Sequence, residues 1–179
     1  GKVVNEGEVD SVLAYYTQNE NVQTPTFELP PPKNNESIFG KHLHFFDKQG
    51  HPNNIFLLKE KWLVSLEFEL TKALPSVVAA IGPVTNEGVP ISVIWSKPKD
   101  LQPGIYSVNY EIKLPLAPCQ LSFIVGLSSR GQTIYYEENI GSATIIEISE
   151  EQQPEYNPNG HGLLITDNEP EIIYQKIIK

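Results

Sequence analysis

The chain is short of several residue types, and each shortage argues against a class of protein. One cysteine, Cys119, stands among 179 residues, so no disulfide can form within the chain, which favours the cytoplasm. One arginine, Arg130, and a formal net charge of −9 argue against nucleic acid or anionic lipid as a partner. No apolar run approaches the roughly 18 residues of a membrane-spanning helix. Methionine is absent even at position 1, so we expect a piece of a longer protein.

The clearest pattern that is present fills residues 101–149. Residues 105–112 alternate between apolar and polar side chains, the period of a strand with one buried face. Residues 120–127 alternate in the same way and end at the glycine-bearing loop 128–131, which is typical of a hairpin. A return strand over 133–149 is interrupted by an asparagine and a glycine. We therefore predict a β-meander against which the rest of the chain packs.

The stretch before the predicted meander also consists of strands. Residues 38–47 and 62–71 alternate along their length, whereas 76–81 is apolar on both faces and therefore suits a central strand. Residues 89–96 predict a further strand that carries Trp95. With a short strand near 55–58, this gives about eight strands spaced by roughly 8–12 residues. The prediction is an all-β fold, an antiparallel β-sandwich of the immunoglobulin-like or jelly-roll-like kind.

The sandwich is expected to occupy residues 37–149. Residues 17–36 are polar and proline-rich, which predicts a linker. In the alternative, this segment lies across the domain and is anchored by Phe27 and Leu29. Residues 150–179 read as a C-terminal extension that can add one late strand, either to its own sheet or to that of a second copy.

Paired carboxylates raise the possibility of glycoside hydrolysis. Glu67 and Glu69 share one strand face, and Glu137 and Glu138 are adjacent, whereas a glycosidase needs two carboxylates across the scissile bond. Glutamates on an exposed strand face are ordinary solvated residues. We therefore expect no catalytic residues and no enzymatic activity in this chain.

Metal and phosphate sites have little support in the sequence. His42 and His44 share a strand face, and His51 follows in a turn, but no cysteine pair or third ligand at helical spacing completes a site. The loop Gly82–Gly88 lacks the spacing and the lysine of a phosphate-binding loop. The expectation is that this chain holds no metal and no cofactor.

A polar and aromatic surface is the best candidate for a binding site. Sugars are bound by amides, carboxylates and guanidinium groups through their hydroxyls, and by aromatic rings through their C–H faces. Outward positions and strand ends supply such groups, and the candidate ligand-binding residues are Trp95, Ser107, Asn109, Glu111, Arg130, Tyr135 and Tyr136. In the alternative, these residues form a solvated surface.

Several motifs resemble the C-terminal domain of the ATP-binding subunit of O-polysaccharide ABC exporters, the Wzt family. They are L-x-P-G-x-Y-x-V at 101–108, LSFIVGLSSRG at 121–131, then IYYEEN and ATIIEI, together with FFDKQGHP at 45–52. Residues 1–16 predict an amphipathic helix and resemble the closing segment of an ABC nucleotide-binding domain. The closing strand departs from the family pattern, because isoleucines stand where an aromatic residue is common.

The resemblance implies a non-catalytic domain that binds the non-reducing terminus of an O-antigen polysaccharide. It implies a location in the cytoplasm, at the inner face of the bacterial inner membrane. ATP and Mg would bind a missing upstream domain, which would also contact the transporter permease. It further implies a homodimer that exchanges its C-terminal strands. The alternative function is an immunoglobulin-like module for protein–protein interaction or dimerisation.

Overall fold

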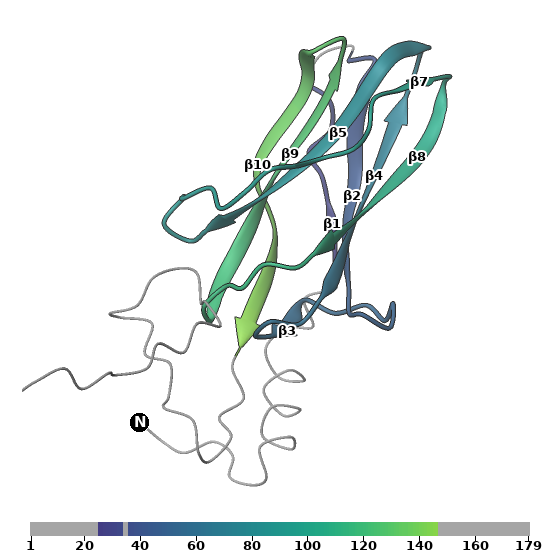
Figure 1. The fold of residues 1–179 in the computed structure, drawn as a ribbon. Coiled ribbons are helices and arrows are strands. Elements are labelled where there is room, and N and C mark those ends of the chain that lie inside the picture. Colours follow the sequence, from purple (N-terminus) through teal and green to yellow (C-terminus); the bar gives the residue numbers. More distant parts are fainter. Residues whose placement is uncertain (1–24, 34–35, 147–179) are drawn as a thin grey trace, which may run out of the picture.

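The structure, a computed structural model, describes residues 25–33 and 36–146, and within these ranges every regular element is a strand. The strands form two facing layers (Figure 1). One sheet has the order β1-β2-β4-β8, and the other has the order β3-β10-β9-β5-β6, with β7 also paired to β5. The bounds are β1 Thr26–Glu28, β2 Ile38–Phe46, β3 Ile55–Leu57, β4 Trp62–Leu70, β5 Leu74–Thr85, β6 Ile94–Trp95, β7 Lys99–Leu101, β8 Gly104–Ile112, β9 Cys119–Ser129 and β10 Gln132–Ile146.

The two layers confirm the predicted all-β sandwich. Alternating positions along β4 are buried from Trp62 to Leu70, while the residues between them are only half-buried. The same alternation holds in β8, because one face of each strand packs on the opposite sheet. In β2 it changes parity at a register shift between Gly40 and His42 and then resumes. One pair departs from the antiparallel pattern, since β3 runs parallel to β10. The helix expected within residues 1–16 and the extension 150–179 lie outside the described residues.

The predicted meander is wrong at its first connection. Strand β8 pairs with β4 in the four-stranded sheet, whereas β9 lies in the other sheet between β5 and β10. The chain crosses between the layers at residues 113–118, where Pro115 and Pro118 cannot donate ladder hydrogen bonds. Leu116 and Ala117 in this crossing are buried. The hairpin of β9 and β10 is the part of the meander that the structure retains.

Two other strands differ from their predicted extents. The interrupted return strand is a single strand, β10, whose register with β9 shifts near Asn139 and Gly141. Both residues have positive φ angles, 58° and 68°, which is the backbone form of β-bulges. The strand expected over 89–96 contracts to β6, two residues long.

The segment before residue 34, expected to be a linker, contributes to the sandwich. Strand β1 pairs with β2, and Leu29 is buried against Gly40, where an added Cβ would meet the Leu29 side chain at 2.6 Å. The Tyr135 hydroxyl donates a hydrogen bond of 2.8 Å to the carbonyl oxygen of Pro30. This arrangement is the alternative in which Phe27 and Leu29 anchor the segment on the domain.

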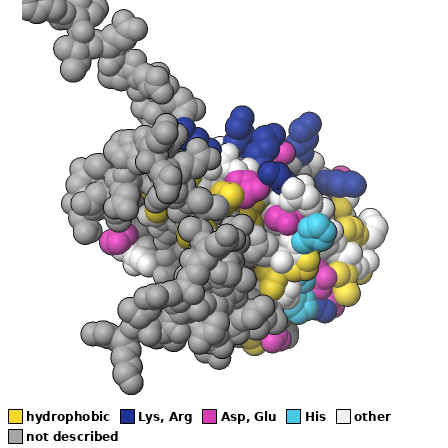
Figure 2. Space-filling view, turned by 90° about the horizontal axis from the view of Figure 1, so that it is seen from below, with side chains coloured by type: hydrophobic (Ala, Val, Ile, Leu, Met, Phe, Trp, Pro, Cys, Tyr) yellow, Lys and Arg dark blue, Asp and Glu magenta, His cyan; other side chains and the backbone are white. Residues whose placement is uncertain are grey.

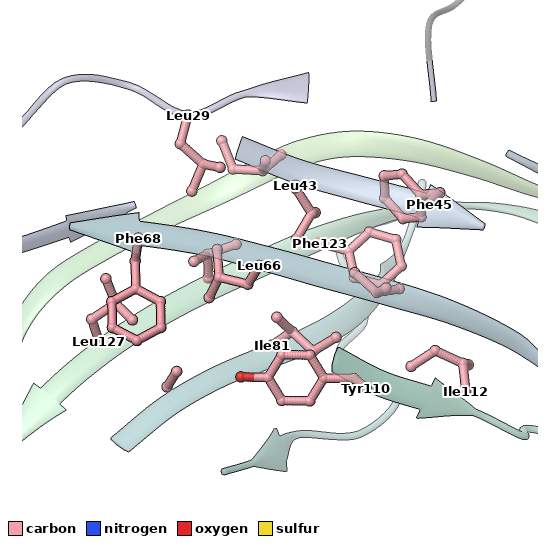
Figure 3. Packing of buried hydrophobic residues seen from close by; sticks show 14 of the residues in the cluster. Leu29, Leu43, Phe45, Leu66, Phe68, Ile81, Tyr110, Ile112, Phe123 and Leu127 are labelled. Carbon is pink, nitrogen blue, oxygen red and sulfur yellow. The ribbon is translucent and has the colours of Figure 1, made fainter. Parts of the chain in front are cut away.

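The core between the sheets is rich in aromatic rings (Figure 3). The Trp62 ring stacks on Phe56 with centroids 4.3 Å apart, and Phe45 contacts Phe123 at 5.1 Å. Gly141 lies against this cluster, and a Cβ added there would meet the Phe45 ring at 3.0 Å. The filled interior leaves the outward faces of the two sheets as the surfaces on which a binding site can form.

Candidate functional site

The seven predicted ligand-binding residues fall in four separate places. Ser107, Asn109 and Glu111 lie on the outer face of the four-stranded sheet, where β8 alternates between exposed and inward residues. The carboxylate of Glu111 accepts a hydrogen bond of 3.0 Å from Lys61. Arg130 is exposed at the turn between β9 and β10, with a φ angle of 50°. All four side chains are exposed to solvent.

Tyr135 does not belong to any surface. Its side chain is 2% exposed, and its strand partner Leu127 is also in the core. Consecutive residues of a strand point to opposite faces, so in the Tyr135–Tyr136 pair only one ring can face solvent. The placement of Tyr135 on a binding surface is therefore wrong. Burial, followed by the charges of Glu137 and Glu36, raises the pKa of its phenol.

Trp95 and Tyr136 share the outer face of the six-stranded sheet. Trp95 pairs with Ala80 across β6 and β5, Ala80 pairs with Gly126 on β9, and Gly126 pairs with Tyr136 on β10. The four residues thus form one row across four neighbouring strands. Among the tryptophan, tyrosine and phenylalanine residues that the structure describes, these two are the most exposed, at 69% for Trp95 and 48% for Tyr136. We call this row the aromatic platform.

Small residues at the centre of the aromatic platform leave its rings accessible. The end residues of the row are about 14 Å apart across the sheet, since neighbouring strands are about 4.8 Å apart. Between them lie a methyl group at Ala80 and a hydrogen at Gly126, and the Tyr136 ring comes to 4.0 Å from the Cβ position of Gly126. Two rings separated by small residues provide flat apolar contact area for a short, broad ligand.

Hydrogen-bonding groups border the aromatic platform. The Tyr136 hydroxyl donates a hydrogen bond of 2.7 Å to Glu138. This hydrogen bond raises the pKa of the Tyr136 phenol, and burial and the nearby negative charge add to the effect. On the side towards Gly82, the backbone of Ser92 and the side chain of Val93 cover the sheet.

A second polar group on this sheet was missed by the sequence reasoning. Asn86 donates to the side-chain oxygen of Gln120 at 3.1 Å, and the Gln120 amide donates to the Ser142 hydroxyl at 2.9 Å. Gln120 has the same outward parity as Gly126 on β9. Six residues separate them, which is about 20 Å along a strand. The sequence does show amide and hydroxyl side chains at the ends of strands, which could have indicated this group. It was missed because the three residues are far apart in the chain.

The carboxylates considered for hydrolysis are engaged with other groups. Glu69 accepts from Lys41 at 3.2 Å, and Glu67 lies 3.2 Å from the Nδ1 atom of His42. Glu138 is bonded to Tyr136, as described above. These contacts assign the glutamates structural partners on the two outer faces.

The outer face of the four-stranded sheet also gathers histidines. Donor atoms of His42, His44 and Glu67 all lie within 4.8 Å of one another. Burial lowers the pKa of His44, and the neighbouring His42 lowers it further against an opposing effect of Glu67. The three donor atoms are close enough together to hold one cation, which the sequence analysis did not expect.

Comparison with known proteins shows similarity at the level of the fold. No family model matches the chain, and no curated protein matches it in sequence. Among solved structures, the C-terminal domain of Wzt is similar at a TM-score of 0.59 and 8% identity, over 71% of this chain and 80% of that one. A putative beta-galactosidase from Bacteroides fragilis gives a TM-score of 0.40 at 16% identity, over 56% of this chain and 15% of that one. The likeness to the Wzt domain confirms the sandwich that the sequence predicts.

A third similar structure is a Niemann-Pick type C2 protein from Japanese carpenter ant, with a TM-score of 0.43 and 12% identity, over 66% of this chain and 99% of that one. Within residues 25–33 and 36–146, no helix has the length and apolarity to cross a bilayer.

Proposed function

We propose that this chain is a non-catalytic carbohydrate-binding domain that recognises the non-reducing terminus of an O-polysaccharide. The observation that carries the proposal is the aromatic platform, in which Trp95 and Tyr136 flank Ala80 and Gly126. Sugar rings present C–H groups that pack on aromatic faces, and hydroxyls that bond to neighbouring polar atoms. The fold likeness to the C-terminal domain of Wzt supports the same class of function.

Charged groups of both signs lie near the aromatic platform. Glu138 is bonded to Tyr136, and the exposed Lys97 follows Trp95 by two residues. Arg130 stands four residues beyond Gly126, about 14 Å along the strand direction. The proposal therefore rests on ring packing and hydrogen bonding rather than on the charge of the glycan terminus.

The setting of the domain follows from the same proposal. The domain would lie in the cytoplasm, at the inner face of the bacterial inner membrane, behind an ATP-binding domain that holds ATP and Mg. That upstream domain would contact the transporter permease, and two copies would associate through their C-terminal strands. A motif resemblance in residues 1–16 supports the position of the upstream domain.

The test is calorimetric titration of the chain with O-polysaccharide from its own source, in wild type and in four variants. Trp95→Ala and Tyr136→Ala should each weaken binding at least about tenfold, the effect of roughly 1.4 kcal/mol or more at an interface aromatic residue. Ser107→Ala and Asn109→Ala lie on the other sheet and should leave the affinity unchanged.

Two results would count against the proposal. Loss of binding in Asn109→Ala with retention in Trp95→Ala would move the glycan to the four-stranded face. Absence of binding with every polysaccharide tested would favour a protein partner instead. The exposed apolar residues Val89, Val93 and Trp95 support that second candidate, in which the 86–95 segment docks on a protein surface.

A further inference from the structure

Two histidines and one glutamate come together on the outer face of the four-stranded sheet. His42 and His44 are two residues apart on β2, so both side chains point outward. Glu67 reaches the same place because β4 pairs antiparallel with β2, with His42 opposite Glu67. Figure 2 shows that histidine side chains lie beside acidic ones on one part of the surface.

We propose that His42, His44 and Glu67 bind a divalent transition-metal ion of the zinc class. Two imidazoles and one carboxylate are a donor set found at zinc sites that keep a fourth position for water. Imidazole also selects transition metals over magnesium and calcium, which prefer oxygen ligands. The site lies on the sheet face opposite to the aromatic platform, so it does not depend on the proposed glycan-binding function.

The distances require only side-chain rotation to form a coordination shell. The Nδ1 atom of His42 and the Oε1 atom of Glu67 are 3.2 Å apart, close to the roughly 3.3 Å between two ligands of a tetrahedral ion with bonds near 2.0 Å. The three donor atoms lie within 4.8 Å of one another, so the widest separation must close by about 1.5 Å to reach that geometry. The His42 and Glu67 side chains are about one-third exposed, which leaves them free to turn.

Thr26 orients the second histidine and acts as a positioning residue. Its Oγ1 atom lies 2.9 Å from the Nδ1 atom of His44. When the hydroxyl accepts this hydrogen bond, the proton resides on Nδ1 and the lone pair on Nε2 is available to a metal. Outer partners of this kind fix the tautomer and orientation of metal-binding histidines.

The neighbouring charges are arranged so that Glu67 stays available. Lys41, the nearest cation along β2, is paired with Glu69 at 3.2 Å rather than with Glu67. Glu28 stands opposite His42 on β1, which adds a further carboxylate at the rim. The three ligands thus come from β2 and β4, and β1 contributes through the contact of Thr26 with His44.

The test is binding of Zn²⁺ and Co²⁺ to untagged, chelator-treated chain, followed by calorimetry and by the visible absorption of Co²⁺. Wild type should bind one ion per chain, and Co²⁺ bands should disappear when Zn²⁺ is added. His44→Ala and Glu67→Gln should each weaken binding by more than about 100-fold, because loss of an outer partner alone commonly costs 10–100-fold. Thr26→Val should weaken binding roughly tenfold.

The control variants are His51→Ala, whose imidazole pairs with Asp47 at 3.3 Å, and His161→Ala, outside the described residues. Both should bind Zn²⁺ as wild type does, and Zn²⁺ should raise the melting temperature of wild type and of the controls but not of His44→Ala. Circular dichroism of each variant checks that it is folded. Unchanged affinity in folded His44→Ala or Glu67→Gln, loss of binding in a control, or no binding to wild type at millimolar Zn²⁺ would overturn the proposal.

Discussion

Replacing Tyr110 with phenylalanine is expected to preserve or raise the stability of the domain, whereas the same change at Tyr135 is expected to lower it. Both tyrosines are core residues, with exposed fractions of 4% and 2%. The Tyr135 hydroxyl donates to the Pro30 carbonyl. The Tyr110 hydroxyl has no hydrogen-bond partner among the described residues, and Figure 3 shows the Tyr110 ring beside Ile81 in the core.

Both changes remove a buried hydroxyl, but the one at Tyr135 has a hydrogen-bond partner and the one at Tyr110 has none among the described residues. A hydroxyl buried without a partner costs about 1–3 kcal/mol of desolvation, and a satisfied hydrogen bond contributes about 1 kcal/mol. Tyr110→Phe should therefore raise the free energy of unfolding by about 1 kcal/mol. Tyr135→Phe should lower the free energy of unfolding by about 1 kcal/mol. The loss should not be larger, because water can reach the carbonyl oxygen of the half-buried Pro30.

The assay is urea unfolding of wild type and both variants, followed by tryptophan fluorescence. Trp62 is buried and stacked on Phe56, so its emission reports loss of the core. The slopes of unfolding free energy against urea should match, which shows that the same surface is exposed in each variant. If Tyr110→Phe were as destabilising as Tyr135→Phe, the Tyr110 hydroxyl would have a bonded partner and the reasoning would be refuted.

Three further outcomes follow from the same structure. Unfolded phenols ionise near pH 10, whereas burial raises the pKa of Tyr110 and Tyr135 in the folded domain. The free energy of unfolding should therefore fall as pH rises above about 10. Urea midpoints should show a smaller fall in the variant that has phenylalanine at both positions. Gly141→Ala should lower the free energy of unfolding by about 2–4 kcal/mol in the same assay, because Gly141 has a positive φ and its added Cβ would contact the Phe45 ring. Gly131→Ala should lower it by only about 1 kcal/mol, because there is open space around Gly131. Burial, with the charge of Glu87, raises the pKa of the Cys119 thiol, so a thiol reagent at pH 8 should react more slowly with native than with urea-unfolded protein, and equal rates would contradict this.

The sequence predicts the fold well where one strand face is buried and the other is solvated. In β2, β4 and β8 the alternation assigns nearly every inward residue correctly, from Leu43 and Phe45 to Tyr110. β4 and β8 pair without a register shift, and the shift in β2 between Gly40 and His42 comes before Leu43 and Phe45, so parity holds along the rest of that strand. A period of two then fixes both the strand and its buried face.

Strand pairing cannot be read from the same pattern. The alternation of β8 resembles that of β9, yet the two strands belong to different sheets because the 113–118 segment crosses between the layers. Parity is also lost where β10 bulges at Asn139 and Gly141, so the sequence does not decide which of Tyr135 and Tyr136 faces the core. The candidate site was therefore predicted as one surface, although its residues occupy two sheets, a turn and the core.

Cross-strand rows explain why both proposed sites were missed as units. Trp95 and Tyr136 are 41 residues apart in the chain (136 − 95), and His42 and Glu67 are 25 apart, yet each pair lies in a single row of a sheet. Side chains opposite one another on paired strands are near neighbours whatever their separation in sequence. A one-residue slip of register would turn every outward residue of a strand inward, so the buried alternate residues that fix the register also hold both surfaces in place. The two sheets therefore present different chemistry from one core: aromatic rings over small residues on the six-stranded face, and imidazole with carboxylate on the four-stranded face.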